Sequence, residues 1–392
     1  MDLQERLAQL TPEQRRKLAA KLADAKKAKA DEADVVMDFT LFFFSANGRD
    51  TGGDPYGLLL EAARFGDGHG FKAIWTPERH FGDFGGLYPN PTVLAAALAM
   101  VTKRMQLRAG SLVLPLHHPI RVAEDWSVID NLSGGRAAIS FATGWHTHDY
   151  VIDPAAFRDR RETLFRHIEV VRRLWSGERV TLPGVDGAPT PAATLPRPVQ
   201  DTLPIWVTAT SPATWERAGA IGANILTALI AMEADQLGEL VRRYRQTRAK
   251  HGHDPRKGVV SLMLHTYIGD DREAVKNLVR DPMKRYLSQY LDQFRAMGDP
   301  AGDSRDEDTL LGFAFERYFR DRSLMGTVEG CAATIRRMQA LGVDEVACLL
   351  DFGLDRDTVM AGLARLNDLR QAFAPGASGS AHDLAPSMSE NP

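Results

Sequence analysis

The sequence predicts an α/β protein built as a (β/α)8 barrel, the TIM barrel, with insertions. Eight short runs rich in apolar and β-branched residues alternate with longer segments of helical periodicity between residues 39 and 372. Strict alternation requires parallel strands joined by right-handed helical crossovers, and eight such units close a barrel. No Gly-x-Gly-x-x-Gly follows the first strand, as it would in an open dinucleotide-binding sheet.

The first four units follow one another closely. Each expected strand is a run of apolar residues, and the helix after it carries apolar residues at helical spacing, with Pro119 at the start of the third helix. The expected strands are residues 39–44, 71–75, 105–112 and 136–141, and the expected helices are residues 55–65, 92–101, 120–132 and 157–175.

The last four units come after a Pro- and Gly-rich excursion at residues 183–204. Ser211 and Pro212 supply an N-cap and a first helical residue for the helix after the fifth strand. The expected strands are residues 205–208, 224–229, 259–268 and 345–350, and the expected helices are residues 212–221, 235–250 and 356–372, with a longer helical region over 272–338.

The two ends of the chain differ in texture from this middle. Residues 1–34 mix charged residues with leucines at helical spacing, and the segment Thr11-Pro12-Glu13-Gln14 supplies a cap and a capping-box partner. We therefore expect an N-terminal helical linker or docking segment over residues 1–34 and a barrel over residues 35–373. Residues 374–392 are small, polar and Pro-rich, so we expect a disordered tail there.

Composition limits the class of function. The 48 basic and 51 acidic side chains leave a net charge of −3 without a basic stripe, which argues against nucleic acid as the main partner. No run approaches the roughly 20 apolar residues that a membrane span needs. Two cysteines, Cys331 and Cys348, provide no disulfide framework. We expect a cytoplasmic protein that acts on small molecules.

In a (β/α)8 barrel the chemistry lies in the loops after the strands. Glu78, Arg79 and His80 follow the second strand. An imidazole there can move protons near neutral pH, and a neighbouring carboxylate can fix its tautomer. The alternative is that Glu78 and Arg79 form a structural ion pair while His80 only packs.

The third expected strand ends in small residues. Ala109, Gly110 and Ser111 are unusual on a barrel strand that is otherwise bulky. Small side chains at such a position indicate that something flat approaches the backbone closely.

Two histidine pairs invite comparison with metal sites. His117 and His118 are neighbours in sequence and rarely could face one point, and His146-x-His148 has no obvious third ligand at another strand end. We therefore expect no metal. The stretch around Trp145 is better interpreted as a polar wall, with an indole and a hydroxyl, beside a bound cofactor.

The fifth expected strand leads from Thr208 into a helix at the barrel rim. Its first turn offers N–H groups, the positive end of the helix dipole and the hydroxyls of Thr210, Ser211 and Thr214. Helix capping alone would also explain Ser211. The pattern nevertheless predicts a phosphate at this helix.

Three stretches taken together resemble the bacterial-luciferase-like flavin monooxygenases, in order and spacing, across about residues 37–370. They are GFKAIWTPERHF at residues 70–81, LPLHHPIRVAED at 114–125 and LSGGR at 132–136. Within that family, FATGWH at 141–146 and SLMGT at 323–327 resemble the branch embedded in or encoded beside nonribosomal peptide and polyketide assembly lines. Residues 10–15 resemble the inter-domain linkers of such synthetases.

The resemblance implies a reduced FMN at the C-terminal mouth of the barrel, with its phosphate at the helix opened by Ser211. Luciferases have a carboxylate where this chain has Thr210 and an arginine where it has Thr143, so hydroxyls and N–H groups would bind the phosphate here. A non-proline cis peptide bond is implied between Gly110 and Ser111, under the flavin ring. The expected cofactor-binding residues are Phe44, Gly110, Ser111, Ala142, Thr143, Trp145, Thr208, Thr210, Ser211 and Thr214.

The catalytic residues of luciferases do not transfer directly. The position of their proton-transfer histidine holds Arg79, with His80 aligned to the neighbouring residue, and their reactive cysteine is replaced by Ala142. We expect His80 or His146 to handle the proton and Arg79 to steady a peroxide or enolate oxygen. The expected apolar floor is Phe42, Phe44, Leu112 and Phe141.

The activity implied by the resemblance is that of a two-component monooxygenase. FMNH2 from a separate flavin reductase would react with O2 to form a C4a-hydroperoxide, which oxygenates an acyl or aminoacyl substrate held on a carrier protein or free. A homodimer is expected from the same family. Two alternatives remain: an F420-dependent dehydrogenase that moves hydride on the same barrel, and a non-catalytic flavin-storing or docking module that acts through its N-terminal helix.

Overall fold

The structure is a computed structural model that describes residues 36–44, 53–82, 84–144, 146–230, 232–296 and 307–374. The helical segment expected at residues 1–34 lies outside these ranges, as does the expected tail from residue 375 onward, and both stay predictions.

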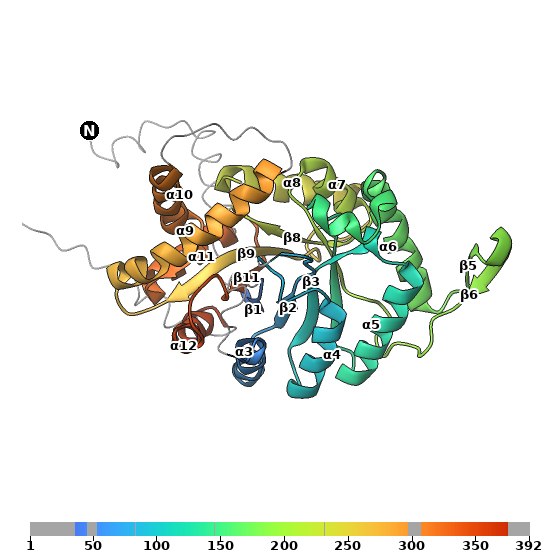
Figure 1. The fold of residues 1–392 in the computed structure, drawn as a ribbon, viewed down its shortest axis with the longest axis horizontal. Coiled ribbons are helices and arrows are strands. Elements are labelled where there is room, and N and C mark those ends of the chain that lie inside the picture. The colour runs from blue at the N-terminus through green and yellow to red at the C-terminus, as the bar shows by residue number, and fades with distance from the viewer. Residues whose placement is uncertain are drawn as a thin grey trace, which may run out of the picture.

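All eight predicted strands are present and close a barrel (Figure 1). They pair in parallel in the order β1-β2-β3-β4-β7-β8-β9-β11, and β11 returns to β1. This confirms the (β/α)8 class and places every strand's carboxyl end at one mouth. The barrel strands are β1 (Asp38–Phe42), β2 (Ala73–Thr76), β3 (Gln106–Val113), β4 (Ala137–Ala142), β7 (Ile205–Thr208), β8 (Asn224–Ala228), β9 (Val260–Ile268) and β11 (Glu345–Leu349).

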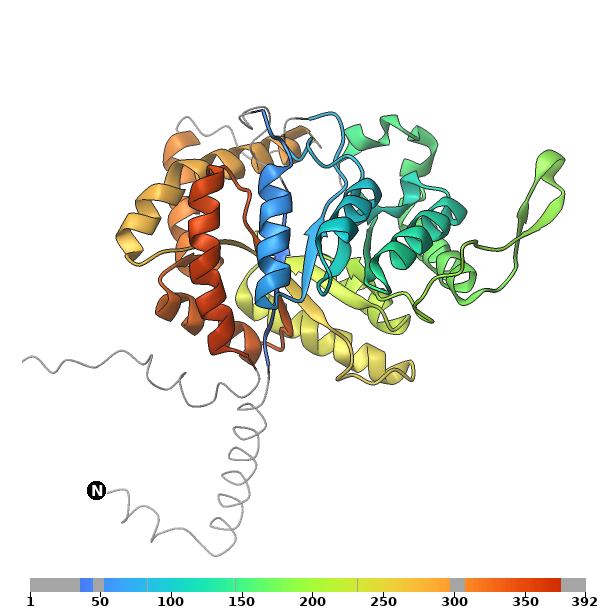
Figure 2. The ribbon, with the colours of Figure 1, turned by 90° about the horizontal axis from the view of Figure 1, so that it is seen from below.

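Helices surround the barrel and bury its outer face (Figures 1 and 2). Their starts are fixed by local chemistry: the side chain of Asn90 caps α4, His118 caps α5 and Ser211 caps α7, and each is followed by proline. The helices are α3 (Gly57–His69), α4 (Pro91–Val101), α5 (Pro119–Ser133), α6 (Arg160–Ser176), α7 (Pro212–Ala220), α8 (Ala234–Lys250), α9 (Arg272–Ala296), α10 (Glu307–Asp321), α11 (Val328–Ala340) and α12 (Arg356–Ala372).

Two regions differ from the sequence prediction. The Pro- and Gly-rich excursion contains an antiparallel hairpin, β5 (Val180–Pro183) and β6 (Pro189–Ala192), which projects from the barrel in both views (Figures 1 and 2). The region expected to be helical over 272–338 contains a short strand, β10 (Leu324–Gly326), which pairs with the far end of β9. Three residues are too few to show a period, which is why the pattern concealed this strand.

The interior of the barrel is filled below the mouth by a buried polar layer. The Arg108 Nη1 atom lies 2.7 Å from Glu345 Oε1, and the guanidinium sits between the rings of Trp75 and Trp206, 4.6 and 4.2 Å from their centroids. The Ser261 hydroxyl donates to the same Glu345 oxygen. All of these side chains are buried, so this layer forms a packed base and not a passage.

Two remaining sequence expectations can be checked within the described residues. Both cysteines are buried free thiols, and burial raises the pKa of Cys331 to about 12. Among the helices of the described ranges, none is both long enough and apolar enough to cross a membrane.

Candidate active site

The residues predicted after β2 lie at the barrel mouth, but their partners differ from expectation. Arg79 does not pair with Glu78: its Nη1 atom lies 2.6 Å from Oδ2 of Asp149, and both side chains are buried. Burial lowers the pKa of Arg79 and raises that of Asp149, and the attraction between the two charges offsets part of each shift. The alternative of a structural Glu78–Arg79 pair is therefore wrong, because a carboxylate from the loop after β4 takes the guanidinium.

Glu78 instead connects two imidazoles. Its Oε1 atom lies 3.0 Å from Nε2 of His80 and 2.7 Å from Nε2 of His117, while Oε2 accepts the backbone N–H of Val113 at 2.7 Å. Burial raises the pKa of Glu78, but the hydrogen bonds from His117 and His80 outweigh it and leave the pKa below its ordinary value. An ionised carboxylate only accepts, so both rings donate through Nε2.

From the sequence alone, His117 was considered only as half of a histidine pair with His118. In the structure the two imidazoles have different partners. His118 Nδ1 accepts from the backbone N–H of Ile120 at the start of α5. His117 contacts the buried carboxylate of Glu78, and although burial lowers its pKa, the hydrogen bond and charge of Glu78 raise it overall. The useful signal was the strand-end position of His117, six residues after the small stretch that ends at Ser111.

His146 lies close to the Arg79–Asp149 pair. Its Nδ1 atom is 4.0 Å from Oδ1 of Asp149, and its ring centroid is 6.2 Å from that of His148. Burial and the nearby charge of Arg79 lower the pKa of His146. Both effects favour the neutral form of this ring.

Three hydroxyls meet in the mouth between β3, β4 and β7. Thr208 Oγ1 lies 2.8 Å from the hydroxyl of Ser140 and within hydrogen-bond distance of that of Ser111. The Gly110–Ser111 peptide bond is cis, as expected. A Cβ at Gly110 would lie 2.9 Å from Phe42 Cε2, so packing inside the barrel already requires glycine there. Ser111 is thus the member of the small stretch whose side chain faces the mouth.

The first turn of α7 has the predicted capping geometry. The hydroxyl of Ser211 accepts from the backbone N–H of Thr214 and lies 2.9 Å from its hydroxyl. Thr210 and Ser211 are exposed and Thr214 is half-buried. This donor set is neutral and contains no carboxylate, so it fits a phosphate better than a cation.

The remaining predicted residues lie around the same mouth. The half-buried Phe44 packs on Phe84, with ring centroids 5.1 Å apart, and its backbone N–H donates to Asp351 Oδ1 at 2.7 Å. Ala142 ends β4 and Thr143 follows it, both half-buried, and the carbonyl of Thr143 accepts from the hydroxyl of Tyr150. Trp145 lies outside the described residues, so its predicted role stays untested.

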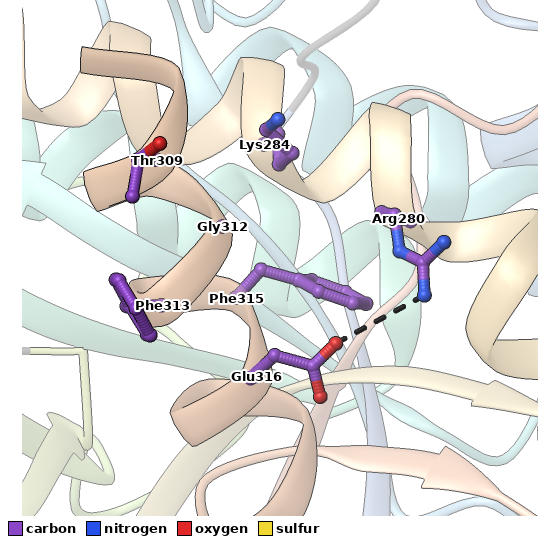
Figure 3. A pocket seen from close by; sticks show the side chains of 7 residues that line it. All are labelled: Arg280, Lys284, Thr309, Gly312, Phe313, Phe315 and Glu316. Carbon is purple, nitrogen blue, oxygen red and sulfur yellow. Dashed lines mark ion pairs between the residues drawn. The ribbon is translucent and has the colours of Figure 1, made fainter. Parts of the chain in front are cut away.

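A hollow of about 250 Å³ lies elsewhere, between α9 and α10 (Figure 3). Phe315 lies between the two helices there, and Glu316 faces Arg280 at 3.9 Å. None of the predicted site residues lines this hollow. The lining residues are Arg280, Lys284, Thr309, Gly312, Phe313, Phe315 and Glu316.

Fold and site together define a (β/α)8-barrel enzyme whose mouth carries buried ionic groups on the loops after β2, β3 and β4 and hydroxyl groups on β3, β4 and β7. The sequence profile of the family described as "Luciferase-like monooxygenase" matches residues 37–345. The chain therefore belongs to this family and is a flavin-dependent monooxygenase.

Two relatives show the level of similarity. The oxygenase component of the flavin-dependent trigonelline monooxygenase of Acinetobacter baylyi is 26% identical over 353 residues, which cover 86% of this chain and 96% of that protein. The 4-hydroxyprotoasukamycin monooxygenase of Streptomyces nodosus is 28% identical over 290 residues, covering 71% of this chain and 76% of that protein.

Solved structures share the fold at lower identity. Monooxygenase RslO1 from Streptomyces bottropensis superposes with a TM-score of 0.71 at 21% identity, covering 85% of this chain and 98% of that one. The oxygenating constituent of 3,6-diketocamphane monooxygenase from Pseudomonas putida, in complex with FMN, gives 0.69 at 18%, covering 87% and 98%. An F420-dependent secondary alcohol dehydrogenase gives 0.66 at 17%, covering 86% and 99%, so the fold alone does not select the cofactor.

Proposed function

We propose that the chain is the oxygenase component of a two-component monooxygenase that receives reduced FMN from a separate flavin reductase and uses O2. The observation that carries this proposal is the placement of neutral donors along one side of the mouth: Ser111, Ser140 and Thr208 in contact, followed by the α7 cap at Ser211 and Thr214. The trigonelline relative is likewise described as an oxygenase component. When bound, reduced FMN supplies the electrons that activate dioxygen.

Several residues would hold the cofactor. The phosphate would take the N-terminal N–H groups and hydroxyls of α7, since no acidic residue stands in its first turn. The ring would lie over the backbone at Gly110 and Ser111, with Ala142 at the end of the neighbouring strand and Thr143 directly after it. Phe42, Leu112 and Phe141 are almost fully buried beneath and would keep water from the ring.

The charged groups on the loops after β2, β3 and β4 would manage protons and charge. Arg79, held by Asp149, places a fixed positive charge where a developing oxyanion gains stabilisation. His80, held by Glu78, and His146, whose pKa is lowered by burial and by Arg79, are the candidate proton-handling groups.

For the substrate we propose an acyl or aminoacyl group, held on a carrier protein in secondary-metabolite biosynthesis. The support is the sequence resemblance at residues 141–146 and 323–327. The second of these segments contains β10 and the Thr327 cap of α11. Incubation of carrier-bound acyl groups with the enzyme, reductase, FMN and O2 should add one oxygen atom by mass spectrometry; free acids oxidised equally well would remove the carrier from the proposal.

The cofactor can be tested by binding under anaerobic conditions. Photoreduced FMN and chemically reduced F420 are titrated separately, and O2 uptake is then followed after mixing with aerated buffer. We expect tighter binding of reduced FMN and O2 uptake that depends on it. Preferential binding of F420 with no O2 uptake would replace the proposal by a hydride-transferring dehydrogenase.

We also propose a homodimer. Two adjacent outer helices expose apolar side chains, Val93 and Met100 on α4 and Val128 and Leu132 on α5, from 43% to 68% accessible. Sedimentation equilibrium should give about twice the chain mass of 43.2 kDa. A monomer at micromolar concentration would contradict this.

A further inference from the structure

The shared carboxylate of Glu78 links two histidines on different loops. Glu78 follows β2 and donates its backbone N–H to the carbonyl of Ser111 at 2.9 Å, so the cluster stands directly beside the end of β3. His80 lies on the loop after β2 and His117 on the loop after β3, and both Nε2 atoms point at the same oxygen, Oε1.

The Glu78 side chain is only 1% exposed, and its carboxylate needs a countercharge because an isolated ion in a protein interior is costly. Two imidazolium rings on one oxygen would repel each other, so the cluster favours one cation and one neutral ring. The side chain of His117 is 35% exposed and that of His80 13%, which makes His117 the ring that exchanges more readily with solvent. The pKa of His117 is raised, in agreement with its role as the cation.

We propose, on the basis of the proposed function, that Glu78 and His117 are positioning residues that hold His80 neutral with its proton on Nε2, so that Nδ1 of His80 is the proton acceptor of the active site. The proposal concerns only where protons sit on the imidazole nitrogens, and no covalent bond between heavy atoms forms or breaks. Nε2–H of His80 donates to Glu78, and the lone pair on Nδ1 is left to take a proton from a bound ligand and later return it.

Other charged groups face His117 and shape its titration. Asp125 on α5 favours its cationic form, while His118 is adjacent in sequence and the ring of His167 on α6 lies against its backbone. Asp125 itself is paired with Arg121, at 2.6 Å between Nη2 and Oδ1, so Glu78 remains the principal anion beside His117.

NMR spectroscopy of the flavin-free protein measures the tautomer and the titration of each histidine directly. In ¹⁵N-labelled protein, long-range imidazole spectra should show neutral His80 protonated on Nε2. In His117→Gln the side-chain amide can still donate to Glu78, but the countercharge is gone, so His80 should take the proton and titrate about one pH unit or more higher. His118→Gln, which changes a helix cap that does not contact Glu78, should leave the His80 titration unchanged.

Activity gives a second reading once turnover is established. The acid limb of the pH profile should move upward in His117→Gln and stay in place in His118→Gln. Neutral His80 protonated on Nδ1, or an unshifted His80 titration in folded His117→Gln, would overturn the proposal. The spectra need neither FMN nor substrate. They therefore test the proposed state of His80 even if the proposed oxygenation is not observed.

Discussion

The guanidinium of Arg79 and the carboxylate of Asp149 form an ion pair with 2.6 Å between Nη1 and Oδ2, and their side chains are only 5% and 3% exposed. The two residues are separated by 70 positions in the sequence and come from the loops after β2 and β4. The pair therefore ties two loops of the barrel mouth together.

Removal of one partner should be costly. We expect Asp149→Ala to lower the free energy of unfolding by about 3 kcal/mol, because it removes the carboxylate that lies 2.6 Å from a buried guanidinium. The double variant Arg79→Met/Asp149→Leu should lose less than Asp149→Ala alone, as measured by urea unfolding. The exposed control Arg121→Ala should change stability by no more than about 0.5 kcal/mol. Equal losses for the buried and exposed variants would show that the pair is not desolvated.

The phosphate site can be tested with two caps of equal shape. Ser211→Asn and Ser211→Asp both retain a side-chain oxygen for the N–H of Thr214, so helix α7 should be equally stable in both variants. The aspartate adds a negative charge where the phosphate is expected. FMN affinity by isothermal titration calorimetry should fall at least about tenfold in Ser211→Asp relative to Ser211→Asn. Identical affinities would place the phosphate elsewhere.

His265 should make stability depend on pH. It is fully buried, its Nδ1 atom lies 2.7 Å from the hydroxyl of Tyr318, and burial lowers its pKa to about 3. The unfolded chain takes up the proton first, near pH 6.5, so this contribution to stability is complete above that pH and is lost as the pH falls toward 3.

The matched variant is His265→Gln, which can still bond Tyr318 but does not titrate. The difference in unfolding free energy between wild type and His265→Gln should shrink by about 2 kcal/mol between pH 7 and pH 5. Parallel stability curves over this range would mean that His265 accepts a proton in the folded protein without penalty.

Gly110 should not tolerate a side chain. A Cβ there would meet Phe42 Cε2 at 2.9 Å and Trp75 Cβ at 3.0 Å, both inside the barrel. We expect Gly110→Ala to destabilise the fold by about 1–3 kcal/mol through overpacking. Thermal unfolding measures this, with Gly134→Ala as a comparison at a position with open space, although its positive φ adds backbone strain. A neutral Gly110→Ala would show that the strands separate easily at this level.

The barrel was predictable because its signals are local. Buried strands such as β4 and β9 are mostly apolar, and the cap at Ser211 with Pro212 marks the start of α7 within two residues. Strand β10 is three residues long and pairs only with the end of β9, so no local period reveals it. The hairpin β5–β6 is rich in proline, a residue that single-sequence reasoning assigns to loops.

The site was only partly predictable, because its partners are distant in sequence. Arg79 and His80 were selected from their place after a strand, but nothing near them indicates Asp149 or His117 as the groups that hold them. Gly110 shows the reverse error: its small size was attributed to a ligand, whereas Phe42 and Trp75 already require it. Such pairings depend on which loops the closed barrel brings together.

In the part of the chain that the structure describes, the Arg108–Glu345 ion pair, with the guanidinium between two indole rings, closes the barrel below its mouth. A ligand that reaches Ser111 through the barrel mouth must also leave through the mouth. When two ligands bind in this mouth, the deeper ligand must therefore bind first and the shallower ligand must leave first. Steady-state kinetics with both ligands should show a compulsory order of binding.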